Sequence, residues 1–274
     1  MALEAPYPEL DEYLAWIGEA GWRLSEIEAS EGAAGNISVC FGWPIEIRRK
    51  FPQTEELDLP LSVPELGGMS MLVTGSGRRL RDIIAEPTAN LGCLSILPGG
   101  KKALLHTSHL RLFDHLTSEL NSHLAVHCDQ IKATGTNFSA VIHAQPRHLT
   151  YLSHIPRYQD QKYLNQHLLR WQPENILNFP EGVGIIPFQV PGSEALMAAT
   201  LKALRQNRVI VWAKHGVVAR SDTSVKRASD RIEYAETAAN YEYLNLVSGE
   251  HGEGLTVDEI RAICKAFNIK QEIF

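Results

Sequence analysis

Two strand-like segments joined by a pair of glycines place the strongest constraint on how this chain can fold. Residues 93–100 read CLSILPGG and residues 101–108 read KKALLHTS, so Gly99 and Gly100 lie between two apolar stretches. A two-residue glycine turn is typical of a β-hairpin, and a hairpin pairs its strands antiparallel. The chain therefore contains antiparallel pairing, which a purely parallel α/β sheet lacks.

Helical and strand-like patterns alternate along the rest of the chain. Period-two apolar stretches predict strands near residues 36–40, 70–75, 140–145, 175–180, 208–216 and 217–220. Apolar residues at helical spacing predict helices near residues 10–21, 78–85, 118–130, 148–154, 161–171, 193–206 and 222–247, with a last helix opened by Thr256 and a capping-box Glu259. We predict an α/β fold in which residues 1–274 form one layered sandwich domain, with helices covering a mostly antiparallel central sheet.

Composition excludes several classes of protein. A chain of 274 residues with 44% hydrophobic content can bury a large core, while a net charge of −6 offers no basic field for nucleic acid. No stretch approaches eighteen apolar residues, and the amino terminus lacks the pattern of a signal peptide, so we expect no membrane partner. Four scattered cysteines without a CxxC pair are typical of free thiols in a reducing compartment. These features predict a soluble cytoplasmic protein.

Three short turns carry residue types that suit an anion. The sequence TGSG at 74–77 precedes a helical pattern, and glycines at such a position turn backbone N–H groups toward one point. It lacks the Lys-Ser/Thr pair of a nucleotide-binding P-loop, so a small phosphate is the favoured ligand. The AAGN turn at 33–36 and the helix start at Thr117 and Ser118 are weaker signals, because each is also typical of an ordinary turn or helix cap.

Histidine and carboxylate residues follow the same pattern of strand ends and helix starts. In the strand that contains His143 and Gln145, alternation places both side chains on one face. This pair is either part of a metal site with an unusual third ligand or an ordinary polar strand end. His215 lies between two apolar runs, and Glu119 begins a helical stripe that continues through His123 and His127. The sequence HLAVH lacks the glutamate of HExxH metalloproteases, so these last two histidines are interpreted as hydrogen-bonded packing residues.

The motifs together resemble the class II aldolase/adducin superfamily, and within it the branch that acts on rhamnulose 1-phosphate. The matching segments span nearly the whole chain in the expected order: GN at 35–36, VTGSG at 73–77, EPTANLG at 86–92, TSEL at 117–120, DQIKATG at 129–135, VIHAQ at 141–145, FPEGVGIIPFQVPGS at 179–193 and WAKHGVVA at 212–219. The resemblance implies a homotetrameric lyase that cleaves a phosphorylated ketose to glycerone phosphate and L-lactaldehyde. It also implies one divalent metal ion in each subunit, expected to be Zn²⁺.

The resemblance implies roles for individual residues. His143, Gln145 and His215 would occupy the positions of the metal ligands, Glu119 would be the acid/base, and Glu174 would be a second acidic residue near the substrate. The residues implied to hold the substrate phosphate are Gly35, Asn36, Ser76, Gly77, Thr117 and Ser118.

The sequence departs from the family pattern at two positions. Ala33 replaces an asparagine expected to hold the substrate, and Gln145 replaces the second histidine of an HxH strand. An amide oxygen is a harder ligand than imidazole, so this exchange would weaken zinc binding or favour Mn²⁺ or Co²⁺. His148 could substitute only if the chain bends back after Pro146. Two rival functions remain: a sugar-phosphate 4-epimerase of the same superfamily, and a metal-free adducin-like binding module.

Overall fold

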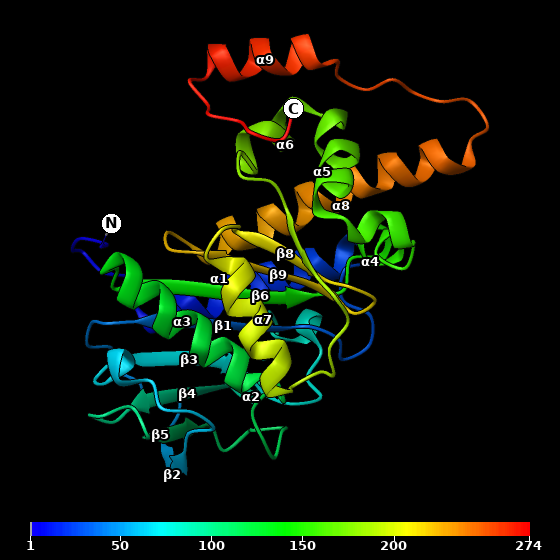
Figure 1. Ribbon diagram of the computed structural model, residues 1–274. Coiled ribbons are helices and arrows are strands. Elements are labelled where there is room, and N and C mark those ends of the chain that lie inside the picture. Colours follow the sequence, from blue (N-terminus) through cyan, green and yellow to red (C-terminus); the bar gives the residue numbers. More distant parts are fainter. Residues whose placement is uncertain (1) are drawn as a thin grey trace.

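A single mixed sheet runs through the computed structural model, which describes residues 2–274 (Figure 1). Within these residues it has nine strands in the order β2-β5-β4-β3-β1-β6-β9-β8-β7. Their bounds are β1 Asn36–Phe41, β2 Gln53–Asp58, β3 Ser70–Thr74, β4 Leu91–Ile96, β5 Lys102–Thr107, β6 Phe138–Ala144, β7 Gly184–Ile186, β8 Val209–Trp212 and β9 Gly216–Ser221. Every strand pair is antiparallel except β7 with β8, so the predicted α/β fold with a mostly antiparallel sheet is confirmed. One domain over residues 1–274 stays a prediction.

Helices cover both faces of the sheet. On one face α3 and α7 lie side by side, and on the other α8 packs against α1, α4, β6 and β9 (Figure 1). Helix α9 stands at one end beside α6. The helix bounds are α1 Leu10–Glu26, α2 Pro87–Asn90, α3 Leu120–Thr134, α4 Arg147–Leu152, α5 Gln161–Leu168, α6 Pro173–Asn178, α7 Glu194–Leu204, α8 Val225–Val247 and α9 Val257–Ala266. The capping box of Thr256 and Glu259 forms as predicted.

Burial explains why the central strands read as continuous apolar runs. All residues of β1 and β6 are buried, because helices cover the two faces of the middle of the sheet. At the edge, the polar strand β2 is almost entirely exposed and pairs only with β5. The rigid centre of the sheet is therefore the part that can position a site.

Two expectations about individual elements were wrong, and one strand was not predicted. Residues 175–180 do not form a strand; most of them belong to α6, which begins with Pro173 at a first-turn position that proline favours and buries Asn175 and Ile176. Strand β2 was not predicted, because its QTEELD residues lack an alternation of apolar and polar side chains. Residues 78–85 form only a 3-10 turn at Leu80–Asp82 rather than a helix.

The strand register brings one end of the central sheet together. Strand β1 begins at Asn36, opposite His143 near the end of β6, and β3 ends beside them at Thr74. The turn between β8 and β9 reaches the same end, because Gly216 begins β9 and β9 pairs with β6. Four segments that are distant in sequence therefore meet at one end of the sheet.

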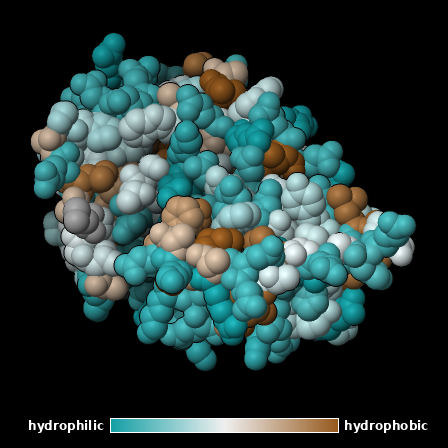
Figure 2. Space-filling view, turned by 90° about the horizontal axis from the view of Figure 1, so that it is seen from above, coloured by the Kyte–Doolittle hydropathy of each residue, from teal (hydrophilic) through white to brown (hydrophobic). Residues whose placement is uncertain are grey.

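No helix within residues 2–274 is long and apolar enough to cross a membrane. Figure 2 shows one face of the molecule, on which apolar side chains gather in small groups between hydrophilic ones. Single exposed apolar side chains are normal on protein surfaces. The surface in this view gives no sign of one large apolar patch.

Candidate active site

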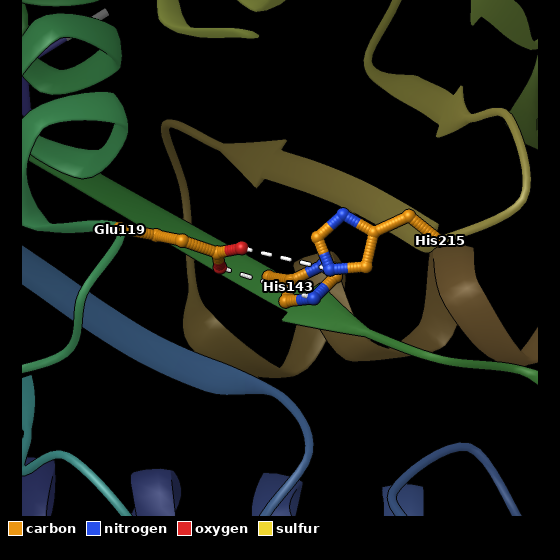
Figure 3. Close-up of side chains that lie close together, drawn as sticks. All are labelled: Glu119, His143 and His215. Atoms are coloured by element: carbon orange, nitrogen blue, oxygen red, sulfur yellow. Dashed lines mark ion pairs between the residues drawn. The ribbon is translucent and has the colours of Figure 1, made fainter. Parts of the chain in front are cut away.

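A carboxylate and two imidazoles converge at this end of the sheet (Figure 3). Glu119 lies at the start of α3, His143 is the second-last residue of β6, and His215 lies in the turn between β8 and β9. The Nε2 atoms of His143 and His215 lie 3.8 and 3.7 Å from the two carboxylate oxygens of Glu119. Among residues 2–274 this is the one group of three or more ligating side chains of this kind.

The surroundings fix how the two imidazoles face the carboxylate. Nδ1 of His143 donates to the carbonyl oxygen of Val217 at 2.9 Å, which leaves the Nε2 lone pair free to bind an electrophile. Trp212 packs against both imidazole rings. Burial lowers the pKa of His215, and the neighbouring His143 lowers it further, so His215 is neutral near pH 7. His215 is therefore in the form that can bind a cation, and Nε2 of His143 faces the same carboxylate.

The three side chains fit a divalent metal ion. Separations of 3.7 and 3.8 Å are too long for hydrogen bonds. Two ligands at about 2.0–2.1 Å from a tetrahedral zinc ion lie roughly 3.4 Å apart, which is close to the separations here. The free Nε2 of His143 supplies the lone pair that such an ion requires. Glu119, His143 and His215 would hold the ion, with room for a further ligand.

Gln145 lies beside this group. Its backbone N–H donates to the carbonyl of Ala29, and its side chain lines the same cleft as His143 and His215. A Cβ atom on Gly216 would lie 2.8 Å from the His143 ring and 3.1 Å from Cγ of Gln145, so both side chains pack against that glycine. Within residues 2–274 no hydrogen bond holds the Gln145 amide. The amide is free to approach a bound ion.

His148 does not join the site. Strand β6 ends at Ala144 and α4 begins at Arg147, so the chain turns away from the cleft before it reaches His148. The Nδ1 atom of His148 is 2.7 Å from a carboxylate oxygen of Glu236, which also accepts the backbone N–H of His148. His148 is therefore hydrogen-bonded to Glu236 of α8 and cannot replace Gln145.

A cleft of about 200 Å³ contains this group together with the three predicted anion turns. Four of its lining residues had no predicted role in binding: Ala33, Ala34, Gly75 and Pro191. The other lining residues are the expected ones, namely Gly35, Asn36, Ser76, Gly77, Thr117, Ser118, Glu119, His143, Gln145 and His215. A larger cavity of about 840 Å³ lies away from these side chains, between the amino-terminal segment, α1 and α8. Of these two, the smaller cleft is the one that unites carboxylate, imidazole and glycine-rich turns.

A family model described as class II aldolase and adducin N-terminal domain matches residues 17–243. This chain belongs to that family. A Bacteroides thetaiotaomicron rhamnulose-1-phosphate aldolase is 28% identical over 98% of this chain and 96% of its own. The Enterobacter enzyme of the same name is 30% identical over 76% of this chain and 74% of its own. A solved sugar-phosphate aldolase from Thermotoga maritima is 27% identical, with a TM-score of 0.74, and the match covers 89% of this chain and 99% of that one.

The turns of this class II aldolase differ in the N–H groups they leave for an anion. The backbone N–H of Ser76 donates to the carbonyl of His115 at 2.7 Å, and that of Thr117 donates to Thr74 at 3.1 Å. Ser76 therefore offers its hydroxyl rather than its amide, a correction to the idea that every amide of this turn faces the ligand. The lining residues, all in the described part of the chain, include no lysine or arginine. An anion here depends on neutral donors, on the start of α3 and on a bound cation.

The side chain of Asn36 makes hydrogen bonds that the sequence did not indicate. Its side-chain nitrogen donates to Oε2 of Glu119 at 2.8 Å, and its side-chain oxygen is hydrogen-bonded to Nε2 of His123. One amide hydrogen remains available to a substrate. Asn36 therefore links the cleft to a buried group behind it as well as facing the cleft.

Glu174 lies elsewhere on the class II aldolase chain. It is an exposed residue in the first turn of α6 and is not among the residues that line the cleft. Within a single chain, Glu174 therefore does not lie in the cleft with Glu119. The four lining residues without a predicted role had only indirect signals, such as the position of Pro191 in the 179–193 segment that carries the family resemblance.

We expect the buried histidines of this aldolase to make folding sensitive to acid. Burial lowers the pKa of His127 to about 3 and that of His123 well below its usual value. The unfolded chain binds these protons near pH 6.5 and the folded chain does not, so stability present above pH 6.5 is lost as the pH falls. The loss approaches about 1.4 kcal/mol per pH unit for each histidine. The free energy of unfolding, measured with urea at pH 7, 6 and 5, should decrease less with falling pH in His127→Leu than in the parent protein. An equal decrease in the two proteins would contradict the prediction.

Proposed function

We propose that this class II aldolase cleaves L-rhamnulose 1-phosphate reversibly into glycerone phosphate and L-lactaldehyde, with a divalent metal ion, Zn²⁺, as its cofactor. The observation that carries the proposal is the convergence of Glu119, His143 and His215 in one cleft with three phosphate-type turns. The substrate is suggested by the names of the relatives, of which the Bacteroides protein matches nearly the whole chain.

The cleavage requires a proton to move as a carbon–carbon bond breaks. The bond between C3 and C4 of the ketose breaks and its electron pair stays on C3 of the C1–C3 half. The C4 hydroxyl loses its proton as the aldehyde forms, and C3 gains one, so the net change moves one proton from the C4 hydroxyl to C3. Glu119 would share a divalent ion with His143 and His215 at rest. During cleavage the ion, held by the two imidazoles with Gln145 beside them, would supply Lewis-acid stabilisation of the developing negative charge. The protein must then deliver a proton to C3 of the glycerone phosphate half.

Glu119 is the group that would carry that proton. Its side chain is almost fully buried at the floor of the cleft, and Asn36 holds one of its oxygens from behind. A carboxylate within hydrogen-bond reach of a reacting group can serve as its acid/base. The hydroxyls of Ser76, Thr117 and Ser118 and the backbone of Gly35 and Gly77 would keep the phosphate in register, so that binding energy is spent away from the reacting carbons.

The assay that tests the function uses purified protein and L-rhamnulose 1-phosphate. We expect release of glycerone phosphate, its loss after treatment with a chelator, and its return when Zn²⁺ is added. L-Fuculose 1-phosphate serves as the comparison substrate and should react more slowly. Formation of a C4-epimer without glycerone phosphate would favour an epimerase, and absence of both metal and turnover would favour an adducin-like binding module.

The phosphate site gives a separate prediction. Replacing Ser76 with leucine removes a hydroxyl from the TGSG turn and fills the space intended for the anion, so KM for the phosphorylated ketose should rise by about 10-fold or more. Thermal stability should change little, because the backbone N–H that ties Ser76 to His115 remains. The control is unphosphorylated L-rhamnulose: if the parent processed it as well as the phosphate ester, the phosphate assignment would be wrong.

We further propose that the protein works in the cytoplasm as a homotetramer with one metal site per subunit, and that Glu174 acts on the substrate in that assembly. Light scattering from purified protein measures the mass of the assembly. Turnover by Glu174→Gln, compared in dilute and concentrated protein, tests whether this exposed carboxylate takes part.

A further inference from the structure

A chain of buried hydrogen bonds runs from Glu119 into the layer between the sheet and α3. Asn36 and Ser38 are two residues apart in β1 and face the same side, while His123 and His127 are four residues apart in α3 and face β1. All five side chains are buried. The Ser38 hydroxyl is 2.6 Å from Nδ1 of His123 and 2.7 Å from Nε2 of His127.

The chemistry of each group fixes the direction of every bond. The side-chain nitrogen of Asn36 faces Glu119 and donates to its Oε2, so the amide oxygen of Asn36 faces His123. That oxygen can only accept, so Nε2 of His123 carries the proton. Burial keeps His123 neutral, so its Nδ1 is an acceptor.

Ser38 completes the sequence of donors. Its single O–H donates to Nδ1 of His123, so its oxygen accepts N–H from Nε2 of His127. Nδ1 of the neutral His127 then carries no proton, and Nδ1 of His127 is indeed a buried atom without a partner. A bare lone pair in that position is compatible with the assignment, whereas a buried N–H without an acceptor would be costly. Every donor in the chain therefore points toward Glu119.

We propose that His123 is a positioning residue for Glu119, and that its Nε2–H, fixed by Ser38 and His127, sets the orientation in which Asn36 presents an N–H to the carboxylate. This inference rests on the proposed role of Glu119 as the acid/base. Without the His123 donor the Asn36 amide could rotate and place its oxygen against the carboxylate, where two acceptors repel. The carboxylate would then lose the bond that holds Oε2 and leaves Oε1 facing His215.

A purely packing role for His123 makes different predictions. Packing requires a side chain of similar shape, whereas positioning requires an N–H donor aimed at Asn36. His123→Leu keeps apolar volume and removes the donor, while His123→Gln keeps an N–H donor of similar reach. The matched control is His106, another buried histidine, which bonds Ser95 and Thr54 on the far strands of the sheet.

The kinetic test compares these variants as metal-saturated full-length proteins. We expect kcat of His123→Leu to fall by about 10- to 100-fold with KM within about twofold, since a misplaced catalytic group costs rate rather than binding. His123→Gln should recover most of the lost kcat, and metal content should match the parent in both. His106→Leu should lose stability and keep its kcat. Equal kcat for His123→Leu and the parent, or equal losses in the Leu and Gln variants, would overturn the proposal.

Neutron diffraction from a crystal of the parent protein tests the bond directions without any activity measurement. We expect deuterium on Nε2 of both His123 and His127 and none on their Nδ1 atoms. Deuterium on Nδ1 of His123 would overturn the proposal even if every variant folds poorly. If the parent showed these proton positions but no aldolase turnover, the proposed function would fail while the direction of the chain stood.

Discussion

Replacing Glu119 with glutamine should leave a folded protein that has lost turnover by about 10²- to 10⁴-fold, the usual contribution of a positioned acid/base. The glutamine amide keeps the shape of the side chain and can still accept from Asn36 through its oxygen, so the buried contact with β1 persists. It cannot take up or release a proton at C3. The measurement is kcat for glycerone phosphate release together with circular dichroism and metal content.

The matched control for Glu119→Gln is Glu194→Gln. Glu194 also stands at a helix start, in the first turn of α7, but it is exposed and lies outside the cleft. Its substitution removes a favourable contact with the helix dipole and should cost no more than about 1 kcal/mol of stability, with unchanged turnover. Near-parental kcat in Glu119→Gln would remove that carboxylate from the mechanism, whereas lost turnover in both variants would point to a general effect of charge.

The fold was predictable where local pattern and tertiary context agree. The Gly99-Gly100 hairpin and the apolar runs of β6, β8 and β9 indicated an antiparallel sheet, because buried strands and tight turns carry strong local signals. The strand prediction for residues 175–180 was wrong because a short apolar run is compatible with either a strand or one face of a helix. Strand β2 carries no apolar pattern, and its pairing with β5 is decided by the neighbouring strand rather than by its own residues.

The site was predictable as a set of residue types but not as a set of contacts. The strand ends and helix start that carry Glu119, His143 and His215 were visible in sequence, and the family resemblance added their roles. The register that places Asn36 opposite His143 is not visible there, because register depends on the assembled sheet. The same limit hid the Ser38 hydroxyl between two helix histidines. Those residues look like ordinary packing until β1 and α3 are brought together.

The surroundings of Gln145 lead to the second large effect. Gln145 and His143 both pack against Gly216, and neither His148 nor any other histidine within residues 2–274 shares their cleft with His215. An amide oxygen at this position gives the site one neutral oxygen where imidazole would be the better zinc ligand. Metal affinity in this chain therefore rests heavily on the two imidazoles and on Glu119.

Replacing His143 with alanine should reduce zinc affinity by at least about 100-fold and abolish turnover, since even changes around a metal ligand commonly cost 10- to 100-fold. Gln145→His should act in the opposite direction and raise zinc affinity by roughly 10- to 100-fold while keeping or improving turnover. His148→Gln is the control: it changes a nearby histidine bonded to Glu236 and should leave zinc affinity unchanged. Competition titrations with a chromophoric chelator in one buffer measure all four proteins. An unchanged zinc affinity in Gln145→His would show that residue 145 does not face the ion, and that the third ligand after His143 and His215 is Glu119 or water.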